Sequence, residues 1–465
     1  MKFSKKTAIE ILNAGLTTGA DYAEIYFQRD ENFSYTRRYK KVYATSSSLL
    51  SGVGIRLLKG NQQVYGYTAN LSKKNLIDLA KQLALGFTGK QELEVKDLKL
   101  KKYKNINVIK KAHNSLSTEE KISYLEKGEK TAFDYSPLVQ DVISAIDEED
   151  EHVEIYNSDG VMTFDDRVRT KVWIEVVCKQ DEKYTNGFEE SSFSKGLELL
   201  DETDFPALAI SATKNAISSL SAVDAPSGEL PVVIGNGFGG VLFHEACGHP
   251  LEGSAICRNI SPFSDKLGQK IGTDILNAFD DGTIPNGWGS ENVDDEGISP
   301  TKNQLIKDGV LVSYMLDRYT TRRVKLDGKV TGSCRRESYM YSPTTRMTNT
   351  YIDNGKSNPE DIIASVKYGI YCKSFTGGQV DTSTDQFIFT SDEAYLIKDG
   401  KLDKRVKSIS LIGYGYEILK KITMIGNDLK LTAGSCGASS GSLYVQVGQP
   451  TLLISSILVG GTGEE

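Results

Sequence analysis

The first 95 residues alternate between helix-like and strand-like patterns of apolar positions. Apolar residues recur three and four positions apart over 5–17 and 72–85, which predicts two amphipathic helices. The alternation of apolar and polar residues predicts strands at 22–28, 32–38, 52–58 and 62–68. The last two of these strands flank Lys59-Gly60-Asn61, a sequence typical of a hairpin loop. We therefore expect residues 1–95 to form a first α+β subdomain.

Residues 96–221 predict a second α+β subdomain. The spacing of apolar residues predicts helices over 117–132 and 204–220. Strand-like alternation is found at 153–156, 161–164 and 167–179, and the turn sequence 157–160 joins the first two strands as a hairpin. The acidic run 147–151 predicts a solvated turn, and the lysine-rich segment 96–111 predicts a solvated linker.

The pattern changes after a boundary at 222–230 that contains proline and glycine. The remainder of the chain consists mainly of short strand-like runs with frequent glycine and few long helical patterns. Residues 222–465 are therefore predicted to form a β-rich carboxy-terminal domain. The whole chain is predicted to be an α+β protein, in which an amino-terminal part of mixed helices and antiparallel strands precedes this β-rich domain.

The composition is that of an ordinary globular protein, because 39% of the 465 residues are hydrophobic and 25% are charged. The net charge of −7 argues against nonspecific nucleic-acid binding. No run of about 18 apolar residues is present, so we expect no membrane-spanning helix. The basic start leads into an amphipathic helix instead of an apolar segment, and the six cysteines do not resemble a disulfide framework. We therefore expect a cytoplasmic protein.

A glycine-rich loop follows the predicted strand at 230–234. The loop, 235–240, matches the G-x-G-x-x-G pattern of dinucleotide-binding sites. The helical pattern after it is interrupted by Gly248 and Pro250, too early for a crossover helix, and no second strand ends in an acidic residue about 20 positions further on. A nucleotide-dependent oxidoreductase is therefore the weakest of the functional interpretations.

The segment His244-Glu245-x-x-x-His249 joins two of the four histidines of the chain through a glutamate. On a regular helix, five steps of about 100° place the two histidine side chains about 140° apart, so they could not bind one ion. A shared metal requires the helix to bulge or unwind between them. Gly248 relaxes the backbone and Pro250 disfavours helix at His249, so the sequence allows this distortion.

A catalytic zinc site typically has three protein ligands, so a third ligand is needed. Cys247 follows His244 by three positions and is the local candidate. Cys436 is the remote candidate, because the small residues around it would permit close approach to an ion. A cysteine in either place could also be a small buried apolar residue.

With these residues the chain resembles the TldD/PmbA family of metallopeptidases, specifically its metal-binding TldD-like branch. The resemblance extends over nearly the whole chain. Its further motifs are found at 51–56, 292–297, 346–351, 377–381 and 447–451. The resemblance implies that His244, His249 and Cys436 bind a metal and that Glu245 is the catalytic carboxylate. A mixed nitrogen and sulfur site suits Zn²⁺ best.

The resemblance implies a metal-dependent peptidase that hydrolyses unfolded or small peptides. It also implies a dimer, either a homodimer or a heterodimer with a metal-free TldE/PmbA-like paralogue. The alternative function is a noncatalytic interaction or regulatory protein, because the family name also carries a link to modulation of DNA gyrase. The presence of Glu245 argues against that alternative, since a purely structural metal site needs no general base.

Four further residues are candidates for supporting roles. Arg335 and Arg336 are candidates for holding a carboxylate of the substrate, although paired arginines are more often structural or surface residues. Glu252 and Asp295 are predicted to orient the metal ligands from outside the ligand set.

Overall fold

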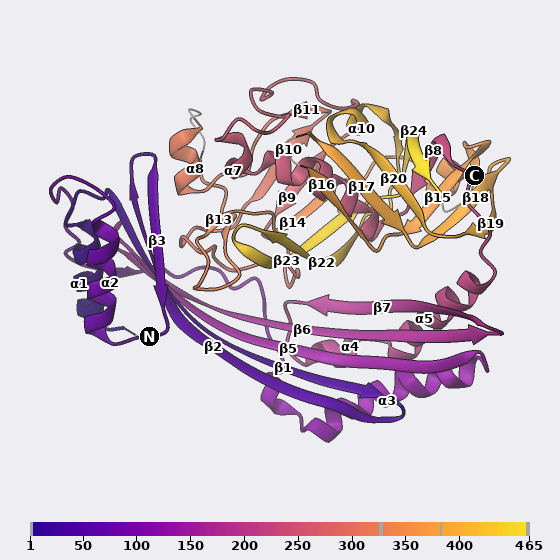
Figure 1. The fold of residues 1–465 in the computed structure, drawn as a ribbon, viewed down its shortest axis with the longest axis horizontal. Helices are drawn as coiled ribbons and strands as arrows, with labels where there is room; N and C mark the ends of the chain where they lie inside the picture. Colours follow the sequence, from indigo (N-terminus) through magenta and orange to yellow (C-terminus); the bar gives the residue numbers. More distant parts are fainter. Residues whose placement is uncertain (1–2, 325–328, 382–383, 462–465) are drawn as a thin grey trace.

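The computed structural model describes residues 3–324, 329–381 and 384–461. A long curved sheet with helices at both ends comes from the amino-terminal half of the chain, and a β-rich body from the remainder lies over the concave side of that sheet (Figure 1). Helices and mostly antiparallel sheets occur in both parts, so the predicted α+β class is confirmed.

The amino-terminal part is built on one sheet of long strands. These strands are β1 (Tyr22–Arg38), β2 (Lys41–Lys59), β3 (Gln62–Thr68), β4 (Lys99–Leu100), β5 (Val139–Asn157), β6 (Val161–Gln180) and β7 (Lys183–Phe193). Within the described residues they form a seven-stranded sheet in the order β3-β2-β1-β5-β6-β4, with β7 paired to β6. Strands from both expected amino-terminal subdomains therefore share one sheet.

Helices cover this sheet at its two ends. They are α1 (Lys5–Leu16), α2 (Lys73–Ala84), η1 (His113–Ser115), α3 (Thr118–Tyr135), α4 (Glu198–Glu202) and α5 (Phe205–Leu220). Helices α1 and α2 pack on one end, and α3 and α5 pack on the other (Figure 1). Helix α3 begins with a capping box, in which Ser117 and Glu120 satisfy each other's backbone N–H groups. The predicted helices at 5–17, 72–85, 117–132 and 204–220 are confirmed to within a few residues.

Two predicted interruptions of the sheet were wrong. Strand β1 is continuous where two strands were predicted, and β5 runs straight through the acidic segment 147–151. Acidic residues are tolerated there because the fold supplies cations. The carboxylate of Glu148 lies 2.7 Å from Lys121 Nζ, and Glu151 lies 3.4 Å from Arg167 on the neighbouring strand. Local charge predicted a solvated turn, whereas partners distant in the sequence make a strand favourable.

The carboxy-terminal body contains two main sheets. The larger sheet consists of β8 (Gly228–Ile234), β15 (Tyr368–Ser374), β16 (Gly377–Asp381), β17 (Gln386–Ser391), β18 (Glu393–Lys398), β19 (Lys401–Val406), β20 (Ile409–Tyr414), β21 (Ile422–Ile425) and β24 (Leu452–Gly460). The second consists of β9 (Ala278–Asp281), β10 (Lys302–Lys307), β11 (Val310–Leu311), β14 (Asn349–Ile352), β22 (Lys430–Ala438) and β23 (Gly441–Gln449). A short ribbon is formed by β12 (Cys334–Arg335) and β13 (Thr344–Thr345).

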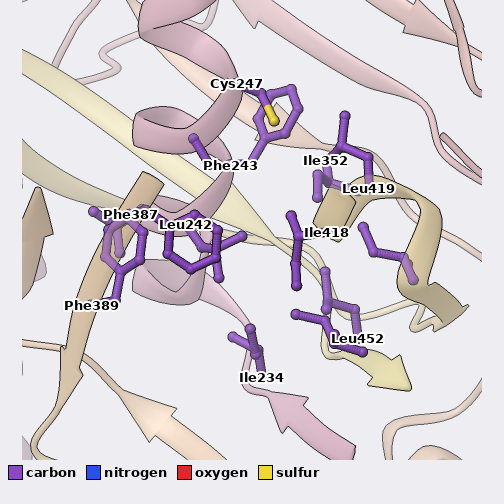
Figure 2. Close-up of a cluster of buried hydrophobic side chains, with 14 of the residues drawn as sticks. Ile234, Leu242, Phe243, Cys247, Ile352, Phe387, Phe389, Ile418, Leu419 and Leu452 are labelled. Atoms are coloured by element: carbon purple, nitrogen blue, oxygen red, sulfur yellow. The ribbon is translucent and has the colours of Figure 1, made fainter. Parts of the chain in front are cut away.

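Short helical turns connect these strands. They are η2 (Gly237–Gly240), α6 (Val241–Phe243), η3 (His244–Gly248), η4 (His249–Leu251), α7 (Gly253–Ile256), α8 (Arg318–Arg323), α9 (Pro359–Ala364) and α10 (Gly415–Lys421). The run from η2 to η4 passes through the apolar core of this body. Leu242 and Phe243 of α6 lie among buried residues of β17, α10 and β24, including Phe387, Ile418 and Leu452 (Figure 2).

The glycine-rich loop 235–240 allows η2 to pack closely against β23. A Cβ atom on Gly240 would lie only 2.5 Å from backbone atoms of Gly448, so a larger residue would push η2 away from β23. The short turns after the loop also differ from the long crossover helix of a dinucleotide-binding unit. The glycines therefore place the η2–η4 segment against β23.

None of the helices that the structure describes is long and apolar enough to cross a membrane.

Candidate metal centre

The two histidines of the His-Glu-x-x-x-His segment lie on a π-helical turn. After α6, the backbone widens into η3, and the N–H of His249 donates a hydrogen bond to the carbonyl oxygen of His244. This bond spans five positions, as in a π-helix, and brings the two imidazole rings to 5.2 Å between centroids. The predicted distortion of the helix between the histidines is therefore confirmed.

A cysteine distant in the sequence completes the cluster. Cys436 lies on β22, and its Sγ is 3.1 Å from Nε2 of His249. One ligand atom from each of His244, His249 and Cys436 lies within 4.8 Å of the others. We refer to these three residues as the His–His–Cys cluster. All three are largely buried.

The chemistry of this cluster fits a divalent metal ion. Neither ring nitrogen of His244 has a hydrogen-bond partner among the described residues, although both nitrogens are buried. A buried imidazole without a partner is costly, and metal coordination is a common way to satisfy one. Two imidazole nitrogens and one thiolate are also a donor set that zinc accepts.

Electrostatics favour the metal-binding form of the cysteine. Burial opposes ionisation of Cys436, but the electrostatic influence of His244 and the hydrogen bond with His249 lower the pKa of its thiol to about 3. The cysteine is therefore a thiolate at neutral pH, which is the form that ligates metals. Burial also opposes protonation of His249, yet the neighbouring Glu252 and Cys436 raise its pKa well above the usual value.

Glu252 and Arg346 connect His249 with the strand that carries Cys436. Glu252 Oε1 lies 3.3 Å from Nδ1 of His249, on the side of the ring opposite Nε2, and 3.8 Å from Nε of Arg346. Arg346 donates hydrogen bonds to the carbonyl oxygens of Cys436 and Gly441 and to the hydroxyl of Ser440. One buried guanidinium therefore contacts both the partner of His249 and the backbone that carries Cys436.

Glu245 lies beside the cluster and keeps access to solvent. Its Oε2 is 3.6 Å from Nε2 of His249, the ring nitrogen that also contacts Cys436. The Glu245 side chain is 20% exposed, whereas that of His249 is 11% exposed. A carboxylate in this position can exchange protons with a water molecule or a substrate near the cluster.

The local candidate Cys247 lies elsewhere. It is fully buried among apolar side chains, including Phe243 and Ile352 (Figure 2). Burial raises the pKa of its thiol well above the usual value, and the nearby Asp385 raises it further. Cys247 is thus a neutral member of the apolar core, and the geometry brings the remote cysteine to the histidines instead.

The structure places Arg335, Arg336 and Asp295 in a buried network between the two parts of the fold. Arg335 donates to Glu291 over 3.0 Å, and Arg336 donates to Glu24 over 2.7 Å. Asp295 accepts from Arg167 over 2.8 Å. Both predicted substrate-binding arginines already have carboxylate partners within the chain, and Asp295 contacts arginines. Their predicted roles toward substrate and ligands stay predictions.

Sequence reasoning missed Arg346 as a contributor to the site. The residue opens one of the family-like motifs, at 346–351, but nothing in its local sequence indicates which backbone it binds. Its hydrogen bonds span about 90 positions to the β22–β23 hairpin. Such a partner becomes visible only when the tertiary structure is known.

Comparison with known proteins identifies the class. The family model of the PmbA/TldA metallopeptidases matches this chain in three consecutive parts: domain 1 at 23–85, the central domain at 111–220 and the C-terminal domain at 227–461. The chain belongs to this family of metallopeptidases.

Its relatives include named metalloproteases. The metalloprotease TldD homolog of Haemophilus influenzae is 37% identical, over 99% of this chain and 97% of the relative. The metalloprotease TldD homolog of Buchnera aphidicola from Acyrthosiphon pisum is 34% identical, over 96% of this chain and 94% of the relative. This chain therefore spans nearly the full length of both relatives.

Solved structures share the fold. TldE from Thermococcus kodakarensis superimposes with a TM-score of 0.77 at 19% identity and covers 98% of this chain and 100% of its own. A protein described as a modulator of DNA gyrase from Bacteroides thetaiotaomicron gives the same TM-score and identity, with 98% of each chain covered. At this level of identity, the likeness concerns the fold alone.

Proposed function

We propose that this protein is a zinc-dependent peptidase that hydrolyses unfolded or small peptides. His244, His249 and Cys436 would hold the zinc ion, and Glu245 would be the general base and acid. One observation carries the proposal: a buried set of two imidazoles and a thiolate lies beside a partly exposed carboxylate. Membership of a metallopeptidase family supports the same reaction class.

Zinc bound to this cluster would supply Lewis acidity toward the scissile carbonyl and acidify a water molecule. Glu245 would accept the proton of the attacking water on its carboxylate and deliver it to the nitrogen of the leaving amine. Its partial exposure allows water to reach it, and its neighbour His244 fixes it beside the cluster. Glu252, whose Oε1 lies 3.3 Å from Nδ1 of His249, would orient the ring so that Nε2 stays directed toward Cys436.

Peptide binding by strand addition suits this architecture. Among the described strands, β22 is the last strand of the second carboxy-terminal sheet, and it carries Cys436. An extended peptide that pairs with such an edge gains backbone hydrogen bonds without much selection of side chains. This arrangement supports unfolded or small peptides as the substrate class.

We also propose that the protein is a cytoplasmic dimer, either with itself or with a metal-free TldE/PmbA-like partner. The resemblance to the TldD-like branch of the family implies a partner of this kind. The six cysteines are all unpaired, which suits a reducing compartment.

The test is peptide hydrolysis by the zinc-loaded protein and by Glu245→Gln. The variant should lose activity by about 10²- to 10⁴-fold, because general acid–base catalysis contributes on that order, while its zinc content stays at the wild-type level. Glu417→Gln is the matched control, since Glu417 is an exposed carboxylate on the neighbouring helix α10. Equal activity of wild type and Glu245→Gln would refute the assigned role. A zinc-loaded wild type that cleaves no peptide would favour the noncatalytic interaction protein.

A further inference from the structure

A cavity of about 360 Å³ lies between the amino-terminal sheet and the hairpin that carries Cys436. Its walls include Asp30 of β1, Glu149 and Glu151 of β5, and Ser435 and Leu443 of the β22–β23 hairpin. Ser435 precedes Cys436 in the chain, and Leu443 is the cross-strand partner of Cys436. The hairpin lies over the concave side of the sheet (Figure 1). The cavity therefore reaches the hairpin next to Cys436, although none of the three cluster residues is part of its lining, and its volume is within the range of small-ligand sites.

The arginines of this cavity are already neutralised. Each of the four arginines in the lining has a carboxylate within 3.0 Å: Arg167 with Asp295, Arg169 with Glu149, Arg335 with Glu291, and Arg336 with Glu24. Two of these carboxylates, those of Glu24 and Asp295, lie outside the cavity lining. An incoming anion would therefore find no free guanidinium charge here.

Asp30 differs from Glu149, Glu151 and Glu291, which each have an arginine partner. Glu337, an exposed carboxylate of the lining, accepts a hydrogen bond from the backbone N–H of Ser442. Asp30 is 9% exposed, and its hydrogen-bond partner is the amide of Asn32, which donates to Oδ2 over 2.9 Å. Its Oδ1 is buried without a hydrogen-bond partner, and no lysine or arginine among the described residues lies within ion-pair distance of Asp30. A buried carboxylate with one unsatisfied oxygen is costly unless a ligand compensates it.

The sheet register adds further negative charge beside Asp30. Asp30 lies directly opposite Glu151 across the β1–β5 pair, and Glu149 lies opposite Asn32 on the same pair of strands. Like charges directly opposite each other destabilise a sheet. Burial, together with Glu149 and Glu151, raises the pKa of Asp30 to about 7, even though Asn32 and Arg169 favour its ionised form. A cation bound between these groups would relieve the repulsion.

Apolar residues complete the walls. Leu443 is buried, Leu50 is half-buried and Met340 is 40% exposed, so apolar surface extends from the solvent side toward the buried carboxylates. Lysine and arginine side chains have this same amphipathic character, with a methylene stem that packs on apolar surface and a charged end. A bare α-amino group has no such stem.

We propose that this cavity is a binding subsite for a basic side chain, lysine or arginine, of the peptide substrate, with Asp30 as the residue that confers the preference. The inference rests on the proposed peptidase function, because it names the substrate class of the same site. Backbone pairing at β22 would leave sequence selection to pockets such as this one.

The experiment measures the cleavage of N-acetylated peptides that carry either lysine or norleucine at a single position. This position is shifted by one residue from each peptide to the next. Norleucine keeps the four-carbon stem and lacks the charge. The wild type should prefer lysine at one position by about tenfold or more in kcat/KM, the size expected for a charge-assisted hydrogen bond. Asp30→Asn, which keeps the shape of the side chain, should reduce that preference to about one. A matched control is Glu175→Gln, on β6 outside the cavity lining, which should keep the preference.

Equal cleavage of the lysine and norleucine peptides by the wild type at every position would overturn the proposal without any variant. Retention of the preference in Asp30→Asn would overturn it as well. The same peptides are also compared with and without the N-acetyl group. If a free N-terminus raises cleavage and lysine has no effect, the group that binds Asp30 is the terminal ammonium, and the side-chain assignment is overturned.

Binding of the same peptides separates this inference from the proposed function. Calorimetric titration into zinc-loaded wild type and Asp30→Asn needs no turnover. Lysine-selective binding that depends on Asp30, without cleavage, would support the subsite and refute the peptidase. Cleavage without lysine selectivity would support the peptidase and refute the subsite.

Discussion

The Sγ atom of Cys436 lies 3.1 Å from Nε2 of His249, although 187 positions separate the two residues in the chain. Two packing relationships produce this contact. The π-turn at η3 turns His249 toward His244, and Arg346 binds the backbone of the hairpin that carries Cys436. The candidate metal centre is thus a product of tertiary structure. Residues that position either the η3 turn or the hairpin of Cys436 should therefore affect metal affinity.

Glu252 is the first such residue, because its carboxylate lies 3.3 Å from Nδ1 of His249. Glu252→Gln should weaken zinc binding by about 10- to 100-fold, the usual effect of removing a carboxylate that orients a histidine ligand. The zinc dissociation constant can be measured by competition with a chromophoric chelator. Glu417→Gln should keep the wild-type constant. An unchanged constant in Glu252→Gln would mean that the contact does not orient His249.

Arg56 should be important for the packing of the carboxy-terminal body against the amino-terminal sheet. Its fully buried guanidinium lies 2.8 Å from Glu24 on the neighbouring strand and 2.6 Å from Glu296 of the carboxy-terminal body. Arg56→Met should lower the free energy of unfolding by about 3–5 kcal/mol, because it leaves the buried carboxylate of Glu296 without its cation, whereas Glu24 keeps Arg336.

Urea unfolding measures this loss, and Arg29→Met provides the control. Arg29 pairs with Glu31 at the surface, where an ion pair contributes only about 0–1 kcal/mol. Equal losses for the two variants would contradict the importance assigned to the buried pair.

His152 should make stability depend on pH in the alkaline range. Hydrogen bonds with Asp166 and Glu154 raise the pKa of His152 to about 9. A raised pKa in the folded state stabilises the fold fully below the unfolded value of about 6.5, and this contribution disappears as the pH rises through about 9. The stability difference between wild type and His152→Gln should therefore be largest near pH 6 and vanish above about pH 9.

Urea unfolding of both proteins at pH 6, 7.5 and 9.5 measures this difference, and groups common to both proteins cancel. The side chain is 35% exposed, so solvent screening should keep the effect small. A difference that grows with pH would have the wrong sign for this explanation.

The sequence predicted the parts of the site that depend on local geometry. The five-residue spacing of His244 and His249 required a departure from the α-helix, and η3 supplies it. Helix ends at Ser117 and Asp204 were also predictable, because capping is local chemistry.

Features that depend on distant partners were not predictable from the residues alone. The acidic run 147–151 was assigned to a turn because Lys121 and Arg167, which pair with it, lie elsewhere in the sequence. The spacing of residues along the sequence also left the choice between Cys247 and Cys436 open, and the family resemblance favoured Cys436. The fold separates the two cysteines, since it places Cys247 in the core and Cys436 beside His249.

The most direct test of the candidate metal centre is the zinc content of the wild type, Cys436→Ala and Cys247→Ala after purification and incubation with zinc. We predict about one equivalent per chain in the wild type and in Cys247→Ala, and none in Cys436→Ala. Cys247→Ala should cost about 1 kcal/mol of stability, as expected for a small cavity in the core. Zinc retained by Cys436→Ala and lost from Cys247→Ala, or absent from all three proteins, would contradict the assignment.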